Sequence, residues 1–65
     1  MTEIYRPGDK VRARYLDADG VDHGWHNGIV HRVGLDGTYI VCWDKTWPGL
    51  NARNSAVEPE DIRRR

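Results

Sequence analysis

Short runs of β-forming residues, each bounded by glycine or aspartate, most constrain what this chain can fold into. The clearest run is Lys10–Tyr15, in which apolar and basic side chains alternate strictly. The apolar positions are Val11, Ala13 and Tyr15, and the basic positions are Lys10, Arg12 and Arg14. A period of two residues is typical of a strand with one face buried and the other in solvent. The preceding Pro7-Gly8-Asp9 run predicts a turn that leads into this strand.

A second and a third strand are expected to form a hairpin in the middle of the chain. Trp25–Val33 indicates the second strand, in which Gly28 marks a bulge or a strong bend. The Gly34-Leu35-Asp36-Gly37 run predicts a tight turn, because Asp-Gly readily adopts positive φ. Thr38–Trp43 is rich in β-formers and apolar on both faces, which favours a central place in the sheet.

The last part of the chain carries weaker signals. Asn51–Val57 indicates a further strand, and Glu58–Ile62 has the proline and the acidic residues of one helical turn. We therefore expect an all-β fold, a small and strongly bent barrel of about five strands with a short C-terminal helical turn. The expected core is Val11, Ala13, Ile29, Val30 or Val33, Ile40 or Val41, Leu50, Val57 and Ile62. Cys42 is expected to be a small buried hydrophobe.

Length and composition narrow the class of protein. The 65 residues predict one domain over 1–65, with room for a single modest core. Cys42 is the only cysteine, so no intrachain disulfide can form and an intracellular, reducing compartment is favoured. Ten basic and ten acidic residues give a net charge of zero, which weakens the case for nonspecific nucleic-acid binding. No apolar run has the length of a membrane span or of a signal peptide, and no motif calls for a cofactor.

An ordered set of short motifs runs from Tyr5 to Arg63. In chain order these are Tyr5-Arg6-Pro7-Gly8-Asp9-Lys10-Val11, Ala13-Arg14-Tyr15, Asp17-Ala18-Asp19-Gly20, Trp25, Trp43-Asp44 and Val57-Glu58-Pro59-Glu60-Asp61-Ile62-Arg63. The set resembles the Tudor type of SH3-like barrel. Two features depart from that pattern: the loop Leu16–Gly24 is longer than usual, and Gly49–Asn54 lacks the usual Asp-Tyr-Gly-Asn corner.

The segment Asp44–Ala56 resembles a different SH3-like protein. With a one-residue gap, it is similar to the end of the small stromal subunit of photosystem I, which helps to dock ferredoxin. Both resemblances imply the same barrel but different partners. This second one implies a structural or adaptor subunit, whose aromatic face would be a protein–protein interface.

Three tryptophans near strand ends are more than a core this small needs, and large rings with polar edges are typical of binding surfaces. The Tudor resemblance implies that Tyr15, Trp25, Trp43 and Trp47 form an aromatic cage completed by Asp44. Such a cage holds a methylated lysine or arginine by cation–π attraction. We therefore predict a noncatalytic, monomeric module that recognises a peptide ligand. The alternative is that Tyr15 and Trp43 cap the core, because each shares its side of the strand with core residues.

Other candidate sites carry weaker signals. Lys10, Arg12 and Arg14, together with the arginines at 63–65, form a basic stripe that could contact the phosphates of a nucleic acid, the third function considered. The alternative interpretation of the stripe is a solvated strand face followed by a charged tail.

Metal and enzyme chemistry are not expected. His23-x-x-His26 and His31 lack the further ligands of a zinc site, and Asp17, Asp19 and Asp22 lack the glutamate of an EF-hand calcium loop. Small SH3-like dihydrofolate reductases exist, but their Val-Gln-Ile-Tyr motif is absent here. No serine or cysteine has a general base at a readable spacing.

Overall fold

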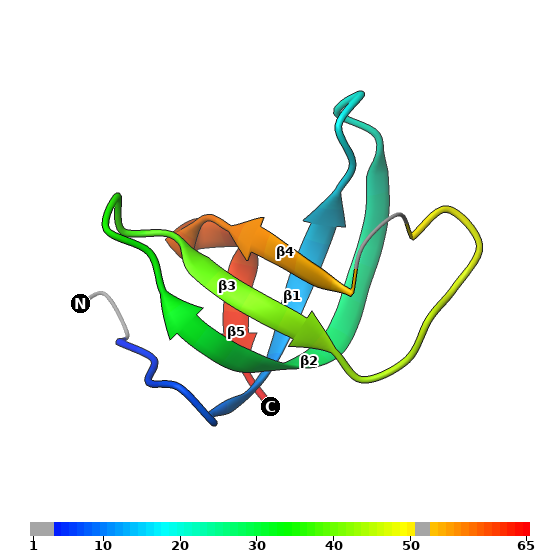
Figure 1. Cartoon of the computed structure of the whole chain (residues 1–65). Helices are drawn as coiled ribbons and strands as arrows, with labels where there is room; N and C mark the ends of the chain where they lie inside the picture. Colours follow the sequence, from blue (N-terminus) through cyan, green and yellow to red (C-terminus); the bar gives the residue numbers. More distant parts are fainter. Residues whose placement is uncertain (1–3, 51–52) are drawn as a thin grey trace.

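A computed structural model describes residues 4–50 and 53–65, and these residues form an all-β fold, as predicted (Figure 1). The strands are β1 (Lys10–Leu16), β2 (Asp22–Val33), β3 (Tyr39–Trp43), β4 (Asn54–Val57) and β5 (Ile62–Arg64). One turn of 3-10 helix, η1 (Pro59–Asp61), lies between β4 and β5, where the sequence predicts a helical turn. The strands form one antiparallel sheet in the order β4-β3-β2-β1-β5, so β3 has a partner on each side, as expected of it.

The long strand β2 connects the two halves of the sheet. Its first part pairs with β1, where Arg14 lies opposite Trp25, and its later part pairs with β3, where Gly28 lies opposite Trp43. The register of the β2–β3 pair shifts between Val30 and Arg32, which marks a bulge. The sheet curves along β2, so that β3 and β4 pass across β1 and β5 (Figure 1), and β4 contacts β1. This curvature lets one face of the sheet enclose the core.

The core lies on the concave face of the sheet. Its buried residues are Tyr5, Val11, Ala13, Tyr15, Val30, Tyr39, Val41, Trp43, Val57 and Ile62. Of the residues expected there, Leu50 is partly buried and packs against this cluster. The rings of Tyr5 and Tyr39 meet edge to face, with centroids 5.3 Å apart. Tyr5 thus brings the segment before β1 into the core.

One expected core residue of β2, Ile29, is exposed, and of the two alternatives Val30 and Val33 the buried one is Val30. The exposed fractions are 37% for Ile29 and 46% for Val33, whereas Val30 is 1% exposed. The reason lies at Gly28, which is buried: a Cβ there would lie 2.5 Å from Val41 Cγ1 and 2.8 Å from the Cys42 carbonyl oxygen. Gly28 therefore marks a close approach of two strands rather than the bulge. The even-numbered positions around it face the core, and the odd-numbered ones face outward.

Strand boundaries and one side chain also differ from the expectations. β2 begins at Asp22, three residues before the expected start at Trp25, and β1 extends one residue further, to Leu16. Cys42 is half-buried rather than buried. The expected start of the fourth strand, at Asn51, lies outside the described residues. Over the ranges that the structure describes, no helix has the length and apolar character needed to cross a membrane.

Candidate binding groove

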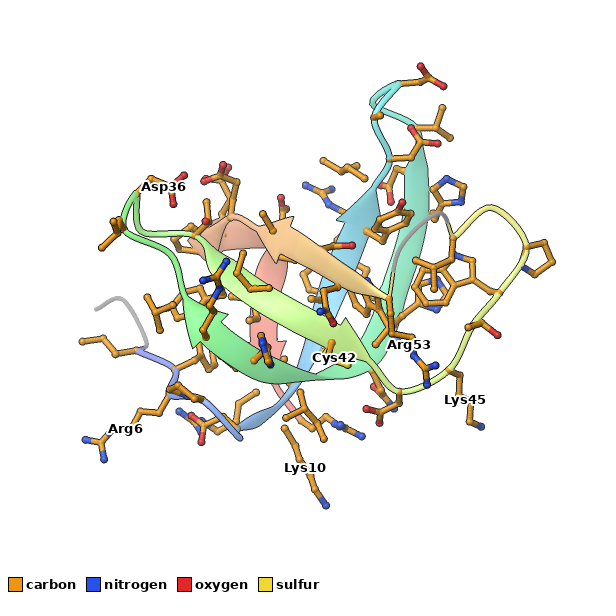
Figure 2. All side chains as sticks on the ribbon, in the orientation of Figure 1. Arg6, Lys10, Asp36, Cys42, Lys45 and Arg53 are labelled. Carbon is orange, nitrogen blue, oxygen red and sulfur yellow. The ribbon has the colours of Figure 1, made fainter. Side chains whose placement is uncertain are left out.

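An open pocket of about 430 Å³ lies where the beginning of β2 meets the loop after β3. Its walls are formed by Arg12, Trp25, His26, Asn27, Asp44, Lys45 and Trp47. We call this pocket the tryptophan groove, because Trp25 and Trp47 contribute its two indoles. Figure 2 shows Lys45 on the loop that leaves the end of β3 and projects away from the sheet. Three of the five residues predicted to form a cage, Trp25, Asp44 and Trp47, therefore line one groove.

The other two predicted cage residues belong to the core. Trp43 is 1% exposed and Tyr15 is 6% exposed, so neither ring faces an open space. Trp43 donates a hydrogen bond from Nε1 to Ser55 Oγ, at 3.0 Å, which satisfies its polar edge inside the fold. Both rings meet Trp47 edge to face, at centroid distances of 5.4 Å for Trp43 and 5.6 Å for Tyr15. The four rings do not surround a common cavity. Tyr15 and Trp43 instead support Trp47 from the core side.

Two histidines of β2 hold the loop that carries Trp47. The imidazole of His26 stacks on the indole of Trp47, with centroids 3.7 Å apart and planes 3° apart. Gly49 passes so close to His23 that a Cβ would lie 2.7 Å from its Cε1, and its φ of +96° also favours glycine. His26 donates from Nε2 to the carbonyl of His23, at 2.9 Å. The two rings therefore form a platform for residues 47–49.

Asp17 fixes one end of this platform. Its carboxylate accepts hydrogen bonds from the backbone N–H groups of Asp19 and Val21 and lies 2.9 Å from His23 Nε2. The hydrogen bond to His23, and then the one from Val21, lower the pKa of the Asp17 carboxyl from its usual value. The Asp17 carboxylate thus holds the backbone of the β1–β2 loop and the ring of His23 in place. No group of three His, Cys, Asp or Glu side chains in the described parts of the chain could hold a metal ion.

Asp44 stands at the rim of the groove and already holds a cation. Its Oδ2 lies 2.9 Å from Nη1 of Arg65, while Nη2 of Arg65 donates to the carbonyl of Gly28 at 2.9 Å. The backbone N–H of Asp44 donates to the Asn27 carbonyl at 3.1 Å, which ties the start of the loop to β2. Arg12 and Lys45 line the same groove, so its charge is mixed rather than acidic.

The predicted basic stripe divides into two parts. Lys10 and Arg12 are exposed on the outer face of β1. Arg14 is held between Asp61, with which Nη2 forms an ion pair, and Asp22, 3.7 Å from Nη1. Asp61 is 6% exposed, so this pair is structural and ties η1 to β1. Arg14 therefore has less freedom to contact an external anion than the other two residues.

The sequence pattern points to His26 only among histidines that lack a full zinc site and to Arg63 only as part of the basic stripe, whereas the structure places both beside predicted cage residues. His26 is half-buried and lies under Trp47. His26 lies two residues before Gly28 and four before Val30, so it shares the inward side of β2 with these two buried residues. The sequence indicates this position only if Val30, and not Ile29, is taken as the core residue. The guanidinium carbon of Arg63 lies 5.2 Å from the Trp25 ring centroid. No sequence pattern could place these two side chains together, because β5 and β2 are separated by β1 in the sheet.

Comparison with known proteins finds no matching family model, no matching curated protein and no matching solved structure.

Proposed function

We propose that this chain is a noncatalytic binding module of the SH3-like, Tudor-like barrel class that takes a peptide ligand in the tryptophan groove. The observation that carries the proposal is the presence of Trp25, Trp47 and Asp44 in the wall of one open pocket of about 430 Å³. The curved five-strand sheet supports the assignment to that class. Two indoles and one carboxylate around a pocket suit a cationic side chain.

A methylated lysine or arginine is the side chain that these groups suit best. Methylation keeps the positive charge and removes N–H groups, so an indole face replaces water around the cation at little cost. The ion pair of Asp44 with Arg65 supports this proposal, because it places a guanidinium 2.9 Å from the carboxylate. A peptide cation would displace Arg65 and take its place beside Asp44. Arg12 and Lys45 at the rim would then favour a peptide with acidic residues beside the methylated one.

The test is an NMR titration of the labelled protein with matched peptides that carry lysine, trimethyllysine, arginine or dimethylarginine. We expect the indole N–H signals of Trp25 and Trp47 to shift with a methylated peptide and to shift less with its unmodified counterpart. Asp44→Asn should weaken that response. Asp36→Asn, in the distant β2–β3 turn (Figure 2), is the matched control. If neither indole signal responds to any peptide, the proposal fails.

Sedimentation of the isolated protein, combined with the same titration, distinguishes the peptide-binding function from the adaptor function. A permanent aromatic interface needs exposed rings, but Tyr15 and Trp43 are buried, which leaves Trp25 and Trp47 to form it. An adaptor would self-associate or would co-purify with a bound partner. Sedimentation of the isolated protein as a monomer, together with a peptide response, would favour the recognition module.

A further inference from the structure

We propose that the outer face around Trp25 binds single-stranded nucleic acid, with Arg12 and Arg63 contacting phosphates and Trp25 stacking on a base. This site adjoins the tryptophan groove but does not depend on peptide binding. A second pocket, of about 420 Å³, lies beside the groove and is lined by Arg12, Trp25, Arg63 and Arg64. Trp25 and Arg12 line both pockets, but Asp44 lines only the groove, whereas Arg63 and Arg64 line only the second pocket.

Two like charges face each other across the β1–β5 pair. Arg12 and Arg63 lie directly opposite one another in the register, and both are exposed. Directly opposed residues of antiparallel strands have Cβ atoms about 5 Å apart and project from the same face, so two arginines there repel each other. An anion bound between them would relieve this repulsion. A phosphate is the anion whose geometry a pair of guanidinium groups matches best.

The aspartates near this face are engaged by other arginines. Arg14, Arg64 and Arg65 are paired with carboxylates of Asp22, Asp61, Asp9 and Asp44. Neither Arg12 nor Arg63 has a carboxylate within ion-pair distance among residues 4–50 and 53–65. Lys10, two residues before Arg12 on the same side of β1, is also exposed (Figure 2). Although the net charge of the chain is zero, the surface around Arg12 and Arg63 is thus locally positive.

An aromatic ring accompanies these charges. Trp25 belongs to β2 and lies diagonally across from Arg12, whose direct partner is Asn27. The Arg63 guanidinium over the indole gives a planar, cationic surface next to an aromatic one. Unpaired bases stack on both kinds of surface, whereas the bases of a duplex are already stacked on each other. The combination of a stacking surface and flanking cations therefore favours a single strand over a duplex.

The experiment measures fluorescence anisotropy of a labelled oligothymidylate of about 12 nucleotides, within the usual site size of small single-strand binding domains. We expect Arg12→Gln and Arg63→Gln each to weaken binding about fivefold and to lower the salt slope by about 0.7. Trp25→Leu should weaken binding by at least about fivefold, the loss of one stacked base. Neither arginine variant should unfold the protein, because both side chains are exposed and each replacement removes a repulsion, although Arg63→Gln also gives up the contact with the Trp25 ring.

Two matched variants distinguish this site from general charge attraction and from the peptide site. Arg32→Gln removes an exposed arginine of β2 that lines a different pocket, near the β2–β3 turn, and should leave the affinity unchanged. Asp44→Asn, which should weaken peptide binding, should leave oligonucleotide binding unchanged or strengthen it. The proposal fails if the wild-type protein does not bind at low salt, if Arg32→Gln is as damaging as Arg63→Gln, or if a duplex binds as tightly as the single strand. Oligonucleotide binding without any peptide response would retain this proposal and reject the peptide function.

Discussion

The imidazole of His26 lies flat on the indole of Trp47, with ring centroids 3.7 Å apart and planes 3° apart. His26 belongs to β2, and Trp47 belongs to the loop after β3. Because His26 Nε2 donates to the carbonyl of His23, the imidazole cannot rotate without losing that hydrogen bond. A fixed ring on a strand thus sets the position of a ring on a loop. The position of Trp47, and with it one wall of the tryptophan groove, depends on His26.

Replacement of His26 should loosen the loop without removing a core residue. We expect His26→Ala to lower the free energy of unfolding by about 1–2 kcal/mol, the combined effect of one aromatic stack and one hydrogen bond. It should also broaden the indole N–H signal of Trp47 and weaken peptide binding. Urea unfolding and NMR line widths measure the two effects. His31→Ala, at an exposed position of the same strand, is the control. Equal effects of the two variants would contradict a supporting role for His26.

Replacement of Gly28, even by alanine, should destabilise the sheet. A Cβ at this position would meet the carbonyl oxygen of Cys42 at 2.8 Å, and a backbone atom in a paired strand cannot move aside cheaply. We therefore expect Gly28→Ala to lower the free energy of unfolding by about 1–3 kcal/mol, the usual cost of an overpacked site. Asn27→Ala, at the neighbouring outward position, should change it by less than about 0.5 kcal/mol. Thermal unfolding of both variants measures the difference, and equal midpoints would contradict the close approach of β2 and β3.

The sequence predicted the elements of the fold better than the orientation of β2. Strict alternation in Lys10–Tyr15 and the Asp-Gly turn of the hairpin are local signals, and both were confirmed. In β2 apolar residues occupy both parities, so Ile29 and Val30 were equally plausible core residues from the pattern alone. The choice depends on the packing of Gly28 against β3, a contact between residues about 14 positions apart, which periodicity does not report.

The candidate site was predictable in its residue types but not in its arrangement. The sequence pointed to all five aromatic and acidic residues, and three of them line the groove. It could not tell that Trp43 faces inward, because β3 is apolar on both faces. Nor could it pair Asp44 with Arg65 or Trp25 with Arg63, since these contacts join segments far apart in the chain. Local sequence patterns do not report contacts between residues that are far apart in the chain and meet only in the folded sheet.

The three tryptophans should differ sharply in their exposure to an external quencher. Trp43 is 1% exposed, whereas Trp25 and Trp47 line the groove. We expect Trp43→Phe to remove the blue-shifted emission that acrylamide quenches poorly, and Trp25→Phe to remove emission that it quenches well. Trp43→Phe should also cost about 1–3 kcal/mol, because it leaves a cavity and an unpaired Ser55 hydroxyl. Efficient quenching of Trp43 would instead place its ring in an open cage.

Acid should destabilise the fold through Asp17. The hydrogen bond with His23, followed by those from the backbone, lowers the pKa of Asp17 from its ordinary value of 3.8. A carboxyl group whose pKa is lower in the folded state than in the unfolded state stabilises the folded state fully at pH values above its ordinary pKa. That contribution disappears as the pH falls below 3.8 and through the folded pKa, because the unfolded state binds the proton first. Thermal unfolding between about pH 5 and pH 2.5 should therefore show a falling midpoint across this window.

Two variants assign that fall to Asp17. Asp17→Asn should lower the midpoint at neutral pH and flatten its decline in acid, because no carboxylate remains to be protonated there. Asp19→Asn, in the same loop, is the matched control, since the Asp19 side chain is exposed and accepts no hydrogen bond within the described residues. The pKa of Asp36 is also lowered, by its hydrogen bonds with Thr38, so Asp36 contributes in the same direction. A residual decline of the midpoint should therefore persist in Asp17→Asn. That decline should shrink further when Asp36→Asn is added. A decline that is unchanged in Asp17→Asn would show that the His23–Asp17 contact does not stabilise the platform beneath Trp47.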